Sequence, residues 1–389
     1  MADQRILVLA DDLTGALEVG GKFSKAGVLS EVRTPAALSS RDLHNAVGAF
    51  VVDTESRHAT STAAAQRVYQ FAHAAREEGF SLVYKKTDST LRGNIGAELA
   101  AVMEAFGGAP VFYVPAYPQM GRTVKDGSLY VHGIPVNATH FASDPFNPVS
   151  DSHIPNLLKP HCHVHIHSGI VNGIAQAEPV GVAICDGETD ADVEAAALAF
   201  TNTPTYRLAA GPAGFAAHLA RLLDLPRDQP AVLPHINKAL IVNGSLHPVS
   251  FHQVELANQM GFTSVERNST LRITSNEVWL IMETGSGAGD ASLDFAQSLA
   301  KSVLRLLTEF PFDALIVFGG DTAYTIVDAL GNPALQMIGE VVEGIPVCKI
   351  EAAELGSTLG ARDRDLYLVT KAGSFGQPEV LSDIRELLG

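Results

Sequence analysis

Two short polar runs could carry chemistry in this sequence, because each directly follows an apolar, β-branched segment. The first is Asp-Asp-Leu-Thr-Gly-Ala at 11–16, and the second is Lys-Lys-Thr-Asp-Ser-Thr-Leu-Arg-Gly-Asn at 85–94. Ligands of open α/β sheets bind at the carboxyl ends of the strands. Carboxylates accept hydrogen bonds from sugar hydroxyls, and cations bind carboxylate or phosphate. The two runs therefore predict a small, anionic, polyhydroxylated substrate.

The individual residues of these runs have structural alternatives. One aspartate of the first run is expected to cap the following helix, a role that Thr14 can share; we predict that Asp11 does so and that Asp12 faces the substrate. Arg57, after a second predicted strand, suits a surface ion pair or a ligand equally well. A lysine pair directly after buried residues is costly unless it serves a purpose.

The C-terminal half has glycine or serine after four predicted strands, at 244–245, 285–287, 319–322 and 373–374. Glycine lets backbone amides approach a phosphate closely, and a helix N-terminus adds partial positive charge. One such loop alone is more often a tight turn, but four on one sheet edge favour a nucleotide site. Neither a P-loop motif nor a dinucleotide fingerprint is present, which disfavours those two classes.

Two further segments each have more than one interpretation. Histidines alternate at 161, 163, 165 and 167, and on a strand all four would share one face. They could bind zinc or nickel, but we favour an exposed edge-strand face, since no carboxylate lies nearby in sequence to support a metal site. The proline-rich segment 115–122 reads as a rigid loop over the cleft, and its Arg122 suits substrate binding and a structural role equally.

The elements that position these residues alternate between strand and helix, which predicts parallel, right-handed βαβ units. A proline-rich stretch at 224–235 marks the linker, after which a second alternating pattern begins. The fold class is α/β, with two domains that each hold a mostly parallel sheet flanked by helices and an active site in the inter-domain cleft. Residues 1–228 are the predicted sugar-acid-binding domain, and 229–389 the nucleotide-binding domain.

Composition excludes several partners. The 389 residues carry a formal net charge of −16, which disfavours nucleic acid and anionic membranes. The three cysteines lack any paired spacing, and no signal-peptide pattern or transmembrane-length apolar run is present. We expect a cytoplasmic protein with reduced thiols, and leave a homodimer open.

The motifs together resemble one family, the four-carbon acid sugar kinases, over nearly the whole chain. Runs 11–16, 85–94, 115–122 and 144–149 are similar to its sugar-binding domain, and the 244–245, 319–322 and 371–376 loops to its nucleotide-binding domain. The resemblance implies substrate contacts from Asp12, Arg57, Lys86, Thr87, Asp88 and Ser89, to which we add Arg92 of the same run. It implies ATP contacts from Ser245, Gly319, Gly320, Asp321, Thr322 and Gly373. The chain departs from the family in Asp321, where Glu is common, and in Leu246-His247.

The resulting prediction is an ATP-dependent kinase that phosphorylates the terminal (C4) hydroxyl of a four-carbon sugar acid, with D-threonate first and 3-oxo-tetronate or D-erythronate as alternatives. Lys86 and Arg57 would face the carboxylate, Asp12 and Asp88 would accept from hydroxyls, and Asp12 would act on the nucleophilic hydroxyl. Mg²⁺ would bridge the ATP phosphates, with no predicted protein ligands. The rivals are a dehydrogenase or aldolase for the same acid, and a non-catalytic sugar-acid binding protein.

Overall fold

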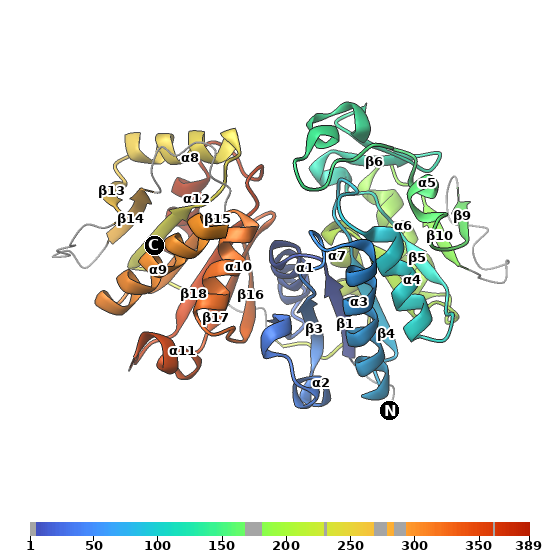
Figure 1. Ribbon diagram of the computed structural model, residues 1–389, viewed down its shortest axis with the longest axis horizontal. Coiled ribbons are helices and arrows are strands. Elements are labelled where there is room, and N and C mark those ends of the chain that lie inside the picture. The colour runs from blue at the N-terminus through green and yellow to red at the C-terminus, as the bar shows by residue number, and fades with distance from the viewer. Residues whose placement is uncertain (1–4, 168–180, 229–231, 268–277, 284–292, 361) are drawn as a thin grey trace. The chain divides into compact units, whose positions relative to one another are not determined.

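The computed structural model describes residues 5–167, 181–228, 232–267, 278–283, 293–360 and 362–389. It divides into two compact units (Figure 1). The first unit comprises Met1–Ser30 and Leu38–Asp228, and the second comprises Glu31–Ala37 and Gln229–Gly389. The short segment 31–37 therefore packs with the C-terminal unit, although it lies early in the sequence.

The first unit is built on a sheet in which every described pairing is parallel. Its strand order is β3 (Gly48–Asp53), β1 (Arg5–Ala10), β4 (Leu82–Lys86), β11 (Leu208–Gly211), β5 (Val111–Tyr113), β10 (Val182–Cys185) and β9 (Val164–His167). The residues Ile6, Leu7, Val8 and Leu9 of β1 are all fully buried, as expected for a parallel strand covered on both faces.

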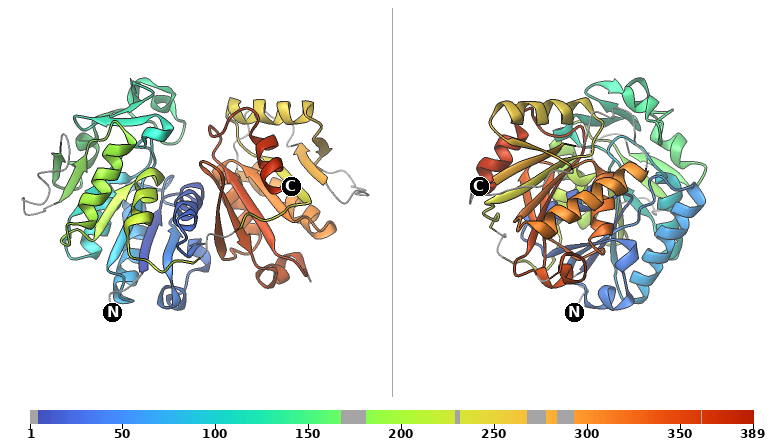
Figure 2. Two further views of the ribbon diagram at one scale, coloured as in Figure 1. Left: turned by 180° about the vertical axis from the view of Figure 1, so that it is seen from behind. Right: turned by 60° about the vertical axis from the view of Figure 1, so that its left-hand side comes forward.

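Helices form two layers on this sheet. One layer joins α1 (Leu13–Lys25), α6 (Asp190–Thr201) and α7 (Ala213–Leu222), and the other joins α3 (Ser61–Glu77), α4 (Ile95–Ala105) and α5 (Ile154–Leu158). Figure 2, seen from behind, shows α6 and α7 in front of the sheet. The chain leaves β1 toward β3 and leaves β3 toward β4, so right-handed crossovers place α1 and α3 on opposite faces.

Smaller elements complete the first unit. A separate antiparallel sheet contains β6 (Arg122–Lys125), β7 (Ser128–Val131) and β8 (Ile134–Pro135). The remaining helical segments are α2 (Ser40–Asn45) and the 3₁₀ turns Pro118–Met120, Val136–Ala138 and His140–Ser143. The segment predicted as a rigid loop thus contains a 3₁₀ turn, and Arg122 begins a strand.

The second unit has a parallel core with an antiparallel edge. Its order is β13 (Thr263–Glu266), β14 (Val278–Glu283), β12 (Lys238–Asn243), β15 (Ala314–Phe318), β18 (Leu366–Lys371), β17 (Ile345–Ile350), β16 (Leu335–Val342) and β2 (Ser30–Arg33). The helices are α8 (Pro248–Gln259), α9 (Leu293–Glu309), α10 (Gly320–Ala329), α11 (Ala352–Leu359) and α12 (Val380–Leu388), with a 3₁₀ turn at Pro35–Ala37. The strands β17, β16 and β2 pair antiparallel.

This architecture confirms the predicted α/β class with mostly parallel sheets. Several elements differ from prediction. The central strand β11 was not predicted; it ends at Gly211, and the next helix begins at Ala213. The antiparallel strands β16 and β17 were also not predicted.

The histidine segment is only partly a strand. Because β9 begins at Val164, His161 and His163 precede it, and the prediction that four histidines share one strand face is wrong. His165 is exposed on β9, which lies at the end of the described sheet. The described residues contain no cluster of three or more His, Cys, Asp or Glu arranged to hold a metal. None of the described helices is long and apolar enough to cross a membrane.

Candidate substrate and nucleotide sites

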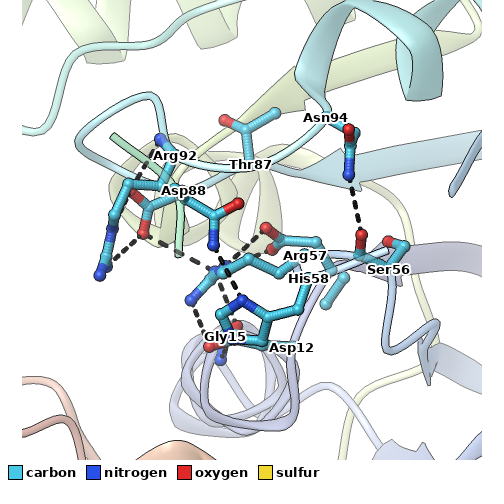
Figure 3. Close-up of polar contacts among 12 residues, drawn as sticks. Asp12, Gly15, Ser56, Arg57, His58, Thr87, Asp88, Arg92 and Asn94 are labelled. Atoms are coloured by element: carbon cyan, nitrogen blue, oxygen red, sulfur yellow. Dashed lines mark hydrogen bonds and ion pairs between the residues drawn. The ribbon is translucent and has the colours of Figure 1, made fainter. Parts of the chain in front are cut away.

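Arg57 is the centre of a charged network at the carboxyl ends of β1, β3 and β4 (Figure 3). Its Nε and Nη2 donate to the two oxygens of Asp11 at 2.8 and 2.9 Å. Its Nη1 and Nη2 also donate to Asp12 at 2.5 and 2.9 Å, and Asp88 Oδ1 lies 3.7 Å from Nη2. Three aspartates from two loops, Asp11 and Asp12 after β1 and Asp88 after β4, are therefore held by one guanidinium, whose side chain is only 11% exposed.

Asp11 and Asp12 have the opposite roles from those predicted at the helix start. Asp12 is the N-cap of α1, in an extended conformation, and its Oδ1 accepts from the amide of Gly15 at 2.9 Å. Asp11 is buried against Arg57; burial opposes its charge, but attraction by Arg57 and the two lysines of β4 lowers its pKa. The assignment of the cap to Asp11 is wrong because the helical conformation starts at Leu13. Asp12 still presents Oδ2 to the site.

Asp88 is fixed by a second arginine. Nε and Nη2 of Arg92 bind its two oxygens at 3.1 and 2.9 Å, and Nη1 of Arg92 reaches Asp144 at 3.4 Å. Thr90 donates both its amide and its hydroxyl to Asp88 Oδ2. Burial would raise the pKa of Asp88, but Arg92 and Arg57 hold it well below its usual range. Asp88 is therefore a charged acceptor at neutral pH.

The two lysines of β4 separate, as alternation along a strand requires. Lys85 Nζ lies 3.0 Å from Glu98 of α4 and is buried. Lys86 Nζ donates to the carbonyl of Thr87 at 3.1 Å and lies 3.7 Å from Glu18 of α1. Lys85 is thus satisfied within the fold, and Lys86 is the lysine of this pair on the α1 side, where Asp12 also lies.

The remaining predicted substrate residues lie on the same loop. The Thr87 hydroxyl is buried 3.5 Å from the hydroxyl of Tyr113, and Ser89 is half-buried in the following turn. The structure thus joins Asp12, Arg57, Asp88 and Arg92 in one network. Sequence reasoning missed Asp144, although its position in a family-like run, 144–149, was a usable signal.

Asp53 is a buried carboxyl beside this network and gives a stability prediction. It is fully buried, Oδ1 accepts from the amide of Glu55, and Oδ2 has no hydrogen-bond partner in the described structure. Burial, with nearby Glu55 and Asp12, raises its pKa well above the usual range. The folded protein then holds a proton that the unfolded chain has lost, so stability falls as pH rises from the unfolded to the folded pKa.

Asp53→Asn cannot titrate and keeps an acceptor for Glu55. We expect this variant to gain thermal stability over the parent above about pH 5, where an unfolded aspartate is ionised, with the gain shrinking toward pH 3. The control is Asp363→Asn, whose side chain is 91% exposed. Melting temperatures of both variants at several pH values test this, and a pH-independent difference for Asp53→Asn would contradict it.

The second unit brings three of the four predicted phosphate loops together. The strands β12, β15 and β18 are neighbours in the parallel sheet, so the loops after them share one edge. A Cβ on Gly244 would collide with Thr322, and one on Gly373 would collide with the Ser245 hydroxyl. The fourth loop, 285–287, lies outside the described residues. Close backbone approach at this edge is what a phosphate site requires.

The α10 N-terminus supplies the donors of this edge. Gly319 has φ = +104°, a conformation that glycine favours, and a Cβ there would lie 3.2 Å from the amide of Ser245. Gly320 starts the helix, so its first amides have no partner within the helix. Asp321 is exposed in the first turn. The predicted nucleotide residues thus converge on one backbone-lined edge.

Lys371 stabilises the neighbouring turn. It is buried at the end of β18, and Nζ donates to the carbonyls of Ala372, Gly373 and Phe375 at 2.9 to 3.1 Å and to Ser250 at 3.2 Å. Burial lowers its pKa to about 7. Because these carbonyls all accept from Lys371, the turn that contains Gly373 is held in one conformation.

Lys371→Met keeps the length of the side chain but leaves those carbonyls without a donor. We expect a lower melting temperature and an ATP affinity that is weaker by about tenfold, since a lost charge-assisted hydrogen bond costs about 1.5–3 kcal/mol. Lys349→Met, on β17, is the control, because the ion pairs of Lys349 Nζ in the described structure are with Glu351 and Asp365, at 3.5 and 3.9 Å. ATP titration calorimetry tests this, and equal affinities in both variants would contradict it.

Comparison with known proteins agrees with the two-unit division. A family described as a sugar-binding N-terminal domain matches residues 6–219, and one described as a nucleotide-binding C-terminal domain matches 282–381. A D-threonate kinase of Bordetella bronchiseptica is 31% identical, covering 98% of this chain and 96% of the relative. A 3-oxo-tetronate kinase of Burkholderia multivorans is 26% identical, covering 95% and 94%.

A solved structure of a Haemophilus influenzae protein from the DUF1537 family has the same fold. Its TM-score is 0.75 at 19% identity, and the match covers 98% of this chain and 100% of that one. The charged network lies within the sugar-binding match, and the 319–322 and 373 loops lie within the nucleotide-binding match. The chain therefore belongs to the four-carbon acid sugar kinase family.

Proposed function

We propose that this protein transfers the γ-phosphoryl group of ATP to the terminal (C4) hydroxyl of a four-carbon sugar acid, with D-threonate as the first candidate. The observation that carries the proposal is the pairing, in one chain, of a carboxylate network in a sugar-binding domain with a backbone-lined phosphate edge in a nucleotide-binding domain. Phosphoryl transfer relies on such positioning and on charge neutralisation.

In the first domain, the proposed substrate residues are Asp12, Arg57, Lys86, Thr87, Asp88, Ser89 and Arg92. Arg57 orients the side chain of Asp12 and Arg92 orients that of Asp88, which suits both to accept hydrogen bonds from the hydroxyls of the acid. Asp12 is the proposed group that orients or deprotonates the C4 hydroxyl. Its cap on α1 fixes Oδ1, and Oδ2, which also accepts from Arg57, is the proposed reactive oxygen.

In the second domain, the proposed ATP residues are Ser245, Gly319, Gly320, Asp321, Thr322 and Gly373. The α10 N-terminus would bind phosphate through the amides of its first turn and its partial positive charge. Mg²⁺ fits this edge because Asp321 offers an exposed carboxylate oxygen, the ligand type that Mg²⁺ prefers. When bound with ATP, Mg²⁺ neutralises phosphate charge. We also propose that the enzyme works in the cytoplasm, where ATP is available.

The test is ADP release with a panel of D-threonate, D-erythronate and their 3-oxo forms, followed by phosphorus NMR of the product. We expect turnover with at least one acid and a phosphate ester at C4. Acid binding without ADP release would indicate the non-catalytic binding protein instead, and phosphate at another carbon would contradict the C4 assignment. A homodimer stays a prediction that light scattering of the purified protein would test.

A further inference from the structure

Arg122 differs from the other cations near the sugar-binding network, because those already have carboxylate partners. Arg57 holds Asp11 and Asp12, and Arg92 holds Asp88. In contrast, no carboxylate lies within 4.0 Å of the Arg122 guanidinium in the part of the chain that the structure describes. Its Nη1 donates to the carbonyl of Met120, and its Nε is buried without a hydrogen-bond partner.

The position of Arg122 is fixed by the fold. It is the first residue of β6, and its backbone pairs with Tyr117 through bonds of 2.8 and 3.0 Å on either side of the Pro118–Met120 turn. Only 8% of the residue is exposed. Burial lowers the pKa of Arg122, while the negative charges of Asp88 and Glu18 raise it, so both carboxylates are electrostatically close. Arg122 is thus a buried cation that belongs to the same electrostatic environment as Asp88.

The free edge of this guanidinium matches a carboxylate. With Nη1 bonded to Met120, the Nε and Nη2 donors remain, and these two N–H groups point in parallel along one side of the planar fork. A carboxylate accepts both in a bidentate pair. A buried cation without a counter-charge is costly, and a ligand that brings the charge would remove that cost. Arg57 and Arg92 cannot do this without giving up an aspartate.

We propose that Arg122 binds the carboxylate of the sugar acid and so sets the preference of the enzyme for acids over uncharged polyols. This inference rests on the proposed function. It also replaces Arg57 as the expected partner of the substrate carboxylate, because the donors of Arg57 already bind Asp11 and Asp12. The hydroxyls then extend from Arg122 toward Asp88 and Asp12, with the carboxylate at the end of the molecule opposite the phosphorylated hydroxyl.

The experiment compares the wild type with Arg122→Met, Arg122→Lys and the control Arg76→Met. Arg76 also donates one hydrogen bond to a backbone carbonyl, that of Ala105, but lies on α3 outside the network. The measurements are the melting-temperature shifts caused by D-threonate and by ATP, and the steady-state constants for D-threonate. Inhibition by threitol, the matching uncharged polyol, reports binding without a carboxylate.

For Arg122→Met we expect loss of the D-threonate shift, an unchanged ATP shift and a KM for D-threonate raised by about 30- to 100-fold, as for a lost charge-assisted bond. The value of kcat should change little, because the contact is made equally in the ground and transition states. Arg122→Lys should recover part of the affinity, since lysine keeps the charge but not the fork. Inhibition by threitol should be the same in wild type and Arg122→Met, and Arg76→Met should match the wild type throughout.

Other outcomes overturn the inference or the function separately. If Arg122→Met binds D-threonate as well as the wild type does, the carboxylate contact lies elsewhere. If Arg122→Met no longer binds D-threonate, threitol or ATP, the role of Arg122 is structural. If no four-carbon acid raises the melting temperature of the wild type or is phosphorylated by it, the proposed function is wrong, independently of the results for the Arg122 variants.

Discussion

Asp12→Asn should lower kcat by about 10²- to 10⁴-fold at saturating ATP and sugar acid, the usual contribution of a general base, with a smaller change in KM. Asparagine keeps Oδ1 for the amide of Gly15, and it is as good an N-cap as aspartate, so α1 should still form. What is lost is the negative charge at Oδ2, which would orient or accept the proton of the attacking hydroxyl. Turnover measured by ADP release checks this.

Asp11→Asn is the matched control, with the opposite expectation. Asp11 is 2% exposed and makes a bidentate pair with Arg57, so its neutralisation should cost about 3–5 kcal/mol of stability, the range for breaking a buried ion pair. The folded fraction should keep most of its turnover. Asp12→Ser adds a second check, because serine caps α1 without supplying a base. High turnover in both Asp12 variants would place the base elsewhere, with Asp88 next, or show that none is needed.

Local signals in the sequence indicated where the charged network of the first unit lies. An apolar run followed by charged residues marked the ends of β1 and β4. The family resemblance singled out Lys86, and alternation along β4 places Lys85 on the other face of the strand. Which aspartate caps α1 could not be read in the same way. Both candidates are aspartates and suit an N-cap equally, so the choice depends on where the helical backbone begins, at Leu13.

The missed parts of the fold depend on pairing between distant segments. β11 lies between β4 and β5, although it begins only at Leu208, long after β4 ends at Lys86 and β5 ends at Tyr113. Similarly, β2 pairs with β16, some 300 residues later, in register Leu335 with Val32. No local pattern specifies such a partner. The sequence predicted that the glycine loops of the second unit share one sheet edge. It could not say which loops are adjacent, because that depends on β12, β15 and β18 being neighbours.

The free donors of Arg122 were also beyond sequence reasoning. The sequence shows several arginines and aspartates around the first domain, and it cannot say which of them pair. Only the geometry reveals that Arg57 and Arg92 are each bound to carboxylates, while Arg122 has no carboxylate partner among the described residues. A cation count alone would assign the substrate carboxylate to the arginine nearest the strand ends. The pairing pattern favours the arginine that the fold leaves unneutralised.

Gly319→Ala should weaken ATP binding by about 30-fold or more while leaving sugar-acid binding unchanged. Alanine is strained at φ = +104°, and relief of that strain would rotate the peptide that leads into α10. The added Cβ would also lie 3.2 Å from the Ser245 amide, at the edge proposed to hold phosphate. ATP titration calorimetry measures the loss, and a D-threonate thermal shift shows whether the first unit is intact.

Backbone strain alone could lower the stability of the protein without changing the proposed nucleotide edge. The control variant must therefore introduce similar backbone strain at another position. Gly331 follows the other end of α10, has φ = +92°, and would place a Cβ 3.3 Å from the Thr358 hydroxyl. Gly331→Ala should therefore lose a similar amount of thermal stability and keep its ATP affinity. If both variants bind ATP equally well, the phosphates are not held at Gly319, because the two substitutions differ mainly in which end of α10 they disturb.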